Sequence, residues 1–210
     1  LREDQVAYEK YFYLRRCMVK AKMEIPGWDN LYVVDIHAVS FSTDNTKQKH
    51  IVEYKNQLDD LHTSGFDFIT GGDLNAIPPE AIKYDYCAED QCFQDAHIWH
   101  TDTSNDSLNY HRKGSYYNNF KELENYPSER DLLILLYDNP DYYSGIPEED
   151  RNESSNFTYG AFNIDNQKSY HDRKLDYLFT NHSDWSLSGN THQEAKSLSD
   201  HIPVSAILYK

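Results

Sequence analysis

The sequence predicts an α/β fold, in which strands and helices alternate along the chain and pack as layers. The first observation is a β-rich run at residues 31–39, followed by a helical pattern and a second apolar run at residues 67–72. A strand, a helix and a strand in this order form a βα unit that feeds a layered sheet. The second observation is that two strand-like runs, residues 173–181 and 202–210, close the chain. Without an internal repeat or a linker, residues 1–210 are expected to form one domain.

The composition argues against some classes of function. The chain has 35 acidic and 20 basic side chains and a net charge of -15, and a surface of that sign repels phosphate backbones. Tight binding to duplex DNA is therefore disfavoured. With 18 Tyr, 9 Phe and 3 Trp, the chain is too aromatic for a disordered acidic segment. No apolar run approaches the roughly 20 residues of a membrane-spanning helix.

The first predicted strand carries a histidine. The run LYVVDIHAV at residues 31–39 follows the turn-like PGWDN, and His37 lies near its end. A histidine in a strand is usually a satisfied core residue, so His37 alone is a weak functional signal. Downstream, four apolar side chains recur at helical spacing: Ile51, Tyr54, Leu58 and Leu61. Gly65 stands where this helix should stop.

The second strand ends in the stretch FITGGDLNAIPPEA, residues 68–81. Gly71 and Gly72 allow a tight turn and a close approach to a ligand, while Asp73 and Asn75 extend from the carboxyl end of the strand. Sheets of α/β proteins place their chemistry at such ends. The same residues are also ordinary turn formers, because Asp and Asn side chains bond to the nearby backbone. On this stretch alone, the two interpretations carry equal weight.

Residues 85–170 differ in character from the rest of the chain. They are rich in Asp, Asn, Tyr and Ser, and they are expected to form long loops or an insertion. One helix is predicted at residues 128–139, with Ser128 as its N-cap and Asp131 in its first turn. Loops of this kind commonly shape access to the active site of an α/β enzyme.

Two polar motifs accompany the last two strands. In RKLDYLFTN, Asp176 interrupts an apolar run, where a carboxylate is costly unless it is paired, for example with a histidine. Alternatively, Asp176 faces solvent beside Arg173 and Lys174. In LSDHIPV, Asp200 and His201 precede a proline and the final strand, which presents both side chains at the mouth of a sheet. Taken alone, such an Asp-His pair is more often a loop detail than a catalytic base.

Together these side chains fit the hydrolysis of a phosphate ester. That reaction needs a divalent cation on the phosphoryl oxygens, a base that activates water, and donors for the charge that develops in the transition state. The aspartates, the asparagine and the two histidines are the residue types that supply those roles.

The order of the motifs resembles the endonuclease/exonuclease/phosphatase superfamily, the DNase I-like fold, whose marks are GDxN, an LDY strand and a terminal SDHxPV. The stretches HAVSFSTDNTKQKHI, GGDLNAIPPEA, RKLDYLFTN and THQEAKSLSDHIPVSA look most like an exported bacterial branch. The resemblance covers the chain from about Tyr13, with a loose match over residues 85–170. It implies a four-layered α/β sandwich of two β-sheets flanked by helices. It also implies an extracytoplasmic place, secreted or surface-anchored.

The resemblance implies a catalytic role for each motif residue. His201 would be the general base, oriented by Asp176. Asp73 and Asn75 would hold the attacking water and the scissile phosphate. His37 matches a second histidine of the superfamily, which contacts phosphate oxygens or helps to protonate the leaving group.

The metal ligands depart from the superfamily pattern. The resemblance places Asp200 at or beside a metal ion, Mg²⁺ or alternatively Mn²⁺ or Ca²⁺. The main ligand of the superfamily is a glutamate in a Gln-Glu motif, preceded by an asparagine, upstream of the strand that carries His37. Neither motif is present in residues 1–30. We therefore expect the chain to be the C-terminal portion of the domain, with the main metal ligand upstream of it.

The leading expectation is a metal-dependent phosphoesterase, a hydrolase that acts as a nuclease or as a small-molecule or lipid phosphodiesterase. Fold resemblance does not choose among these substrates, and the acidic balance favours a small or lipid phosphodiester over genomic DNA. The alternative is a non-catalytic binding module on the same fold, which uses the Tyr-rich loops to bind sugar or protein. The GGDLN, LDY and SDH motifs favour the enzyme, because a binding module has no physical need for a poised carboxylate and histidine.

Overall fold

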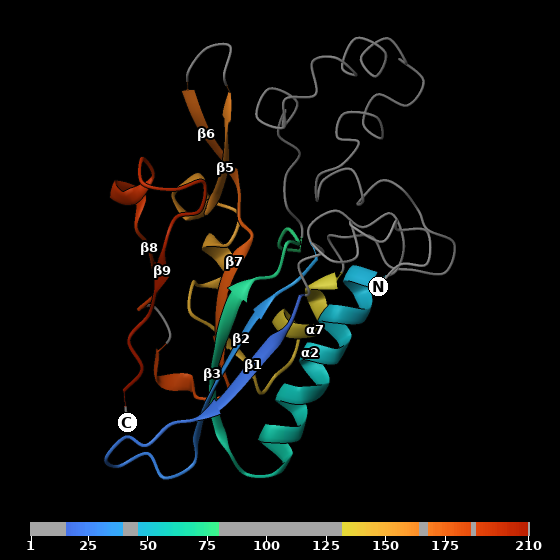
Figure 1. Ribbon diagram of the computed structural model, residues 1–210. Coiled ribbons are helices and arrows are strands. Elements are labelled where there is room, and N and C mark those ends of the chain that lie inside the picture. The colour runs from blue at the N-terminus through green and yellow to red at the C-terminus, as the bar shows by residue number, and fades with distance from the viewer. Residues whose placement is uncertain (1–15, 40–45, 80–131, 164–167, 186–187, 210) are drawn as a thin grey trace, which may run out of the picture.

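The computed structural model describes residues 16–39, 46–79, 132–163, 168–185 and 188–209, which Figure 1 shows as ribbons. Ser128 and Asp131, the predicted start of the helix at residues 128–139, lie outside the described residues. No helix of the described part is long and apolar enough to cross a membrane.

A five-stranded mixed sheet forms the centre of the described structure. In spatial order its strands are β1 (Met18–Lys22), β2 (Leu31–His37), β3 (Asp67–Asp73), β7 (Asp176–Thr180) and β4 (Tyr143–Ser144). Strands β2 and β3 pair in parallel, and the other neighbours are antiparallel. A parallel pair needs a crossover connection, and α2 (Thr46–Thr63) supplies it. The predicted strand, helix and strand are confirmed.

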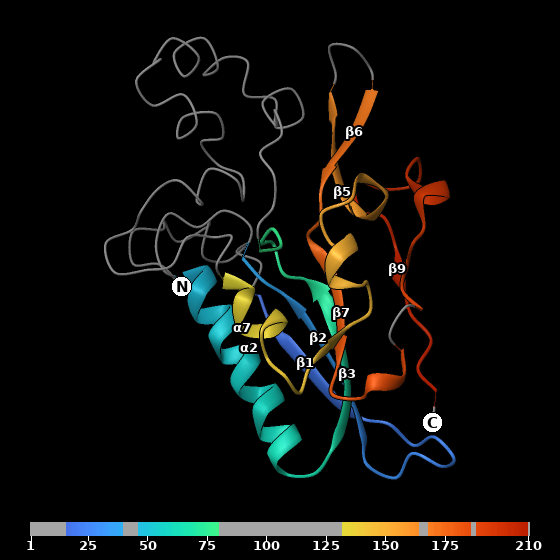
Figure 2. The same ribbon diagram turned by 180° about the vertical axis from the view of Figure 1, so that it is seen from behind.

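Helix α2 packs its apolar side chains against the sheet, as its periodicity predicts. Ile51, Tyr54, Leu58 and Leu61 are all buried, and the chain leaves the helix through Gly65, whose φ is +74°. The short helix α7 (Ile134–Tyr137) packs beside it. Both views show these helices on one side of the sheet (Figures 1 and 2). Of the predicted helix at residues 128–139, the structure describes residues 132–139, and the α-helix there covers only Ile134–Tyr137. The helix is shorter in this part than the pattern predicted.

A buried hydrogen-bond chain links α2 to two central strands. The Thr70 hydroxyl donates to the Val34 carbonyl oxygen at 2.9 Å, and the Tyr54 hydroxyl donates to Thr70 at 2.5 Å. Tyr54 and Thr70 are each 1% exposed. Burial is the main cause that raises the pKa of Tyr54, so the phenol keeps the proton that this chain of bonds requires.

The C-terminal half adds two small sheets outside the central one. One joins β5 (Tyr159–Asn163) to β6 (Lys168–Arg173), and the other joins β8 (Asn190–Thr191) to β9 (Val204–Ser205). Short 3₁₀ helices occupy Glu148–Asp150, Ser154–Asn156, Ser183–Trp185 and Gln193–Ala195. The views agree that the β8–β9 pair lies on the side of the sheet away from α2 (Figures 1 and 2).

Three boundaries differ from the sequence prediction. The predicted strand at residues 202–210 shortens to β9, because its partner β8 has two residues and Pro203 has no N–H to donate. The predicted strand at residues 173–181 begins at Asp176, so this aspartate opens β7 rather than interrupting it. The stretch at residues 85–170, which was expected to form loops, contains β4, β5 and the start of β6 among its described residues.

The pairing of β3 with β7 leaves no room for a side chain at Gly71. A methyl group there would lie 2.2 Å from the Tyr177 carbonyl oxygen, an atom that cannot move without shifting β7. We expect Gly71→Ala to lower the free energy of unfolding by about 3 kcal/mol, measured by urea denaturation. Gly65→Ala is the control, because its site is open and only the positive φ opposes the change, at a cost of about 1 kcal/mol. Equal losses in the two variants would contradict the steric argument.

Candidate active site

Three of the predicted site residues lie in one row across neighbouring strands. The β2–β3 register pairs His37 with Asp73, and the β3–β7 register pairs Asp73 with Asp176. Paired residues point to the same face of a sheet. The row stands where the parallel strands β2 and β3 end, and Nε2 of His37 is 3.2 Å from Oδ2 of Asp73. Strand order and register thus gather residues from three distant parts of the sequence.

The GGDLN turn holds the carboxylate of Asp73 in place. The backbone N–H of Asn75 donates to Asp73 Oδ1 at 2.8 Å, and its side-chain amide donates to Asp73 Oδ2 at 2.7 Å and to the Ala38 carbonyl at 3.1 Å. Asn75 has a φ of +48°, which Asn tolerates better than most residues. The turn and the site are therefore the same feature. Both amide hydrogens of Asn75 are used within it.

A buried lysine that the sequence did not single out supports this turn. Lys47, in the first turn of α2, is 3% exposed and donates from Nζ to the carbonyl oxygen of Asn75 at 2.5 Å. A charged side chain is costly to bury unless it is bonded. Lys47 therefore ties the helix to the backbone conformation of Asn75.

His201 and Asp176 form a hydrogen-bonded pair. Nδ1 of His201 donates to Oδ2 of Asp176 at 2.8 Å, which leaves the lone pair on Nε2 free. Nε2 faces Asp73, with 4.0 Å between it and Oδ2. Burial opposes the charged imidazolium, but the hydrogen bond and charge of Asp176, with the charges of Asp73 and Asp200, outweigh it and raise the pKa of His201.

The carboxylate of Asp73 is the most enclosed acid of the site. Its side chain is 13% exposed, against 20% for Asp176 and 32% for His201. Burial and the neighbouring Asp176 raise the pKa of Asp73, although the Asn75 N–H and the two histidines pull it back. The negative charge of the two carboxylates is therefore concentrated at Asp73, where a bound cation or proton stabilises the site.

Asp200 is placed beside this cluster and is exposed to solvent. Its carboxylate accepts from the Ser199 hydroxyl at 3.1 Å, and its carbonyl accepts from the Gly160 N–H at 2.9 Å. Among the described residues, no three His, Cys, Asp or Glu side chains are arranged to hold a metal ion. Asp73 and Asp200 are oxygen donors of the kind Mg²⁺ prefers, but the described residues alone do not make a complete metal site.

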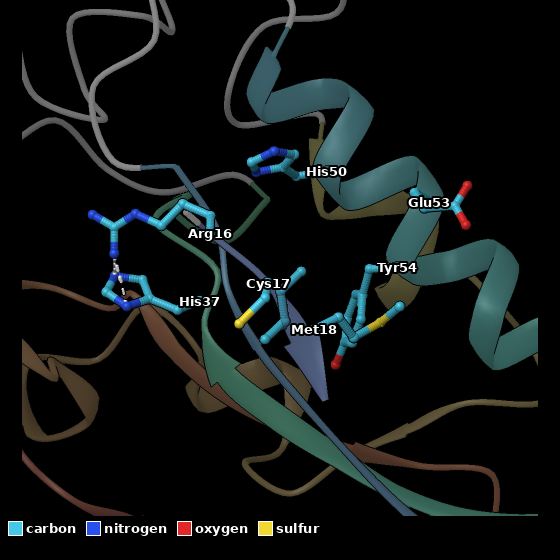
Figure 3. Close-up of a pocket in the computed structure, with 8 residues that line it drawn as sticks. Arg16, Cys17, Met18, His37, His50, Glu53 and Tyr54 are labelled. Atoms are coloured by element: carbon cyan, nitrogen blue, oxygen red, sulfur yellow. Dashed lines mark hydrogen bonds between the residues drawn. The ribbon is translucent and has the colours of Figure 1, made fainter. Parts of the chain in front are cut away.

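A small pocket adjoins the site through His37 rather than lying over His201. It has a volume of about 150 Å³, and Figure 3 shows its lining side chains from β1, β2 and α2. Arg16 lies at its edge, and its Nη1 is 2.8 Å from Nδ1 and 2.5 Å from Nε2 of His37, of which only one can accept its proton at a time (Figure 3). His50 accepts from the Val39 N–H at 3.2 Å. The pocket therefore places the nitrogen groups of Arg16 and His50 next to the cluster of His37, Asp73, Asp176 and His201.

Comparison with known proteins identifies the fold. No protein-family model matches the sequence, and no curated protein matches it significantly. Solved structures do match. The 3′ phosphatase NExo from Neisseria, bound to a product DNA hairpin, has a TM-score of 0.58 at 15% identity, over 100% of this chain and 72% of that one.

Two more structures give the same result. The catalytic domain of Xenopus laevis APE2 has a TM-score of 0.52 at 13% identity, over 92% of this chain and 55% of that one. The 3′-5′ exonuclease NExo from Neisseria meningitidis has a TM-score of 0.51 at 15% identity, over 87% and 62%. All three structures have the DNase I-like fold. The chain therefore has that fold, as its motifs led us to expect.

Proposed function

We propose that the protein is a metal-dependent phosphoesterase that hydrolyses a phosphate ester with a water activated by His201. The observation that carries the proposal is the His201–Asp176 pair. Its 2.8 Å hydrogen bond occupies Nδ1 and leaves Nε2 directed at the space beside Asp73. A base that is oriented in this way and borders a held carboxylate suits the activation of water.

In the proposed reaction, Nε2 of His201 takes a proton from the attacking water while the water oxygen bonds to phosphorus. Asp176 stabilises the imidazolium that forms, because the hydrogen bond to Nδ1 becomes charge-assisted. Asp73, fixed by two bonds from Asn75, orients the water. Asn75 contributes by holding Asp73, since both of its amide hydrogens are engaged.

His37 completes the reaction on the other side of Asp73. Its side chain is 54% exposed, so it can reach a bound ester. As a neutral imidazole that accepts from Arg16, His37 contacts a phosphoryl oxygen of the ester, and solvent water protonates the leaving oxygen when its bond to phosphorus breaks. Arg16, against the His37 ring, adds positive charge near the phosphoryl oxygens, which supports the anionic transition state.

The proposal includes a divalent cation, with Asp200 and Asp73 as the described residues that would contribute to its site. When bound, a Mg²⁺ ion neutralises charge on phosphoryl oxygens. Because the described residues do not complete its ligand set, the steps above are assigned to side chains alone.

A small or lipid phosphodiester, or a single-stranded nucleic-acid end, is the proposed substrate. The similar structures include a 3′ phosphatase and a 3′-5′ exonuclease. This supports a substrate whose phosphate ester lies at or near the end of a nucleic-acid strand. The net charge of -15 opposes a long duplex. Binding of phosphate esters without turnover would instead support the non-catalytic binding module.

We expect His201→Ala to lower kcat on bis-p-nitrophenyl phosphate by about 10²–10⁴-fold, because general base catalysis has that size. His192→Ala is a matched control. Its side chain is 34% exposed, close to the 32% of His201, and it bonds to Glu194 and Ser205 outside the site. Equal turnover by wild type and His201→Ala would contradict the assigned base, and a loss in both variants would point to a general effect on folding.

We also expect chelation of divalent ions to abolish hydrolysis and Mg²⁺, Mn²⁺ or Ca²⁺ to restore it. Asp200→Asn should raise the Mg²⁺ concentration for half-maximal rate and the calorimetric Kd for Mg²⁺ by about 10-fold or more, because a charged oxygen ligand is lost. Asp184→Asn, at an exposed acid away from the site, is the control. Full activity after chelation would refute the metal requirement, and unchanged Mg²⁺ affinity in Asp200→Asn would refute the assigned ligand.

A further inference from the structure

Two segments that are distant in sequence must meet to form the His201–Asp176 pair. The two residues are 25 positions apart, one at the start of β7 and the other in the loop before β9. Residues 158–160, at the start of β5, bond to both segments. None of these residues belongs to a motif that the sequence singled out.

Thr158 fixes the position of Asp176. Its side chain is 0% exposed, and its hydroxyl oxygen accepts the backbone N–H of Leu175 at 2.9 Å and that of Asp176 at 3.0 Å. The Thr158 N–H donates to the Arg173 carbonyl at 2.9 Å. The Thr158 hydroxyl therefore holds the backbone at the start of β7, where Asp176 carries the carboxylate that pairs with His201.

The same short segment fixes the position of His201. The Ile202 N–H donates to the Thr158 carbonyl at 2.7 Å, and the Gly160 N–H donates to the Asp200 carbonyl at 2.9 Å. Between these bonds, Tyr159 pairs with His201 as an isolated β-bridge. The backbone on both sides of His201 is therefore bonded to residues 158–160.

The Tyr159 ring also packs against the catalytic imidazole. The two ring centroids are 5.0 Å apart with an interplanar angle of 60°. The guanidinium of Arg173 also lies 5.6 Å from the Tyr159 ring centroid. An aromatic neighbour at this spacing limits the rotation of the imidazole.

We propose that Thr158 and Tyr159 are positioning residues that hold Asp176 and His201 in the geometry their hydrogen bond requires. The inference rests on the proposed function and adds two residues to its machinery. Without the Thr158 hydroxyl, two buried N–H groups lose their acceptor, and the start of β7 must shift to satisfy them. A shift of a few tenths of an ångström weakens a 2.8 Å bond and turns Nε2 away from the water.

Valine tests the hydroxyl because it matches threonine in shape. We expect Thr158→Val to lower kcat by about 10- to 100-fold, the usual effect of removing a partner that orients a catalytic group, with little change in KM. Thr158→Ser, which keeps the acceptor, should stay near the wild-type rate. A merely structural role would lower only the folded fraction, so kcat calculated per folded protein, with the folded fraction measured by circular dichroism, would stay at the wild-type value.

Thr180→Val is the matched control. Thr180 is also 0% exposed, and its hydroxyl donates to the Phe68 carbonyl at 2.5 Å and accepts the His182 N–H at 3.2 Å. It lies at the opposite end of the same strand from Asp176. We expect this variant to lose stability while its folded fraction keeps the wild-type kcat. A folded Thr158→Val that turns over like Thr180→Val would overturn the proposal.

Tyr159 provides a second test if Thr158→Val does not fold. Tyr159→Phe keeps the ring and should retain kcat, whereas Tyr159→Leu should lower it with KM preserved. Equal rates in the Phe and Leu variants would contradict the positioning role of the ring.

A spectroscopic measurement separates this proposal from the proposed function. A proton on Nδ1 of His201 that is bonded to a carboxylate gives a far-downfield NMR signal, which we expect in the wild type and in Thr158→Ser but not in Thr158→Val. If no phosphate ester is hydrolysed by the wild type, the proposed function fails while this signal still tests the positioning. The same signal in all three proteins would overturn the positioning role.

Discussion

The register between β3 and β7 places Asp73 opposite Asp176, and the other features of the site depend on that pairing. A slip of one residue would turn one of the two carboxylates to the opposite face of the sheet. The pairing requires an unusually close approach, because at Gly71 even a methyl group would lie 2.2 Å from the facing carbonyl oxygen. Gly71 of GGDLN is therefore needed for the packing of β3 against β7, and it affects the chemistry of the site only through that packing.

This register creates an electrostatic problem that the two histidines solve. Two carboxylates side by side repel each other, and the pKa of Asp73 rises because of its burial and of Asp176. His37 and His201 lie on either side of Asp73, at 3.2 Å and 4.0 Å from Oδ2. Asp73 has both histidines as neighbours and Asp176 has His201, so that every carboxylate has a histidine neighbour. In a chain of net charge -15, such an arrangement limits repulsion where the proposed substrate, an anionic ester, would bind.

Local patterns predicted much of the fold and the identity of the central residues. The spacing of Ile51, Tyr54, Leu58 and Leu61 predicted α2, because helical periodicity depends on neighbours in sequence. The GGDLN stretch predicted a strand end that presents Asp73. The pairing of His201 with Asp176 was implied by the resemblance, whereas the residues alone predicted only that a carboxylate in an apolar run needs a partner, such as a histidine.

Features that depend on pairing between distant segments were not predictable. Thr158 and Tyr159 lie in NFTYG, which has no distinctive pattern, and their proposed role comes from bonds to residues that are 15 to 44 positions away in the printed sequence. Lys47 looks like an ordinary polar position of a helix until its bond to Asn75 is seen. The strand at residues 202–210 was overestimated, because β-propensity does not tell whether a partner strand is present.

The most direct test of the account is the pH titration of the His201 imidazole by NMR in the metal-free protein and in its Asp176→Asn variant. The carboxylate stabilises the imidazolium, so the wild-type pKa should lie above the ordinary value of 6.5. Burial lowers the pKa of His201, and the charge of Asp176 opposes this effect. Without that charge, the pKa of His201 should fall in the variant. The same midpoint in both proteins would show that the two side chains are not coupled, and the proposed base would lose its physical basis.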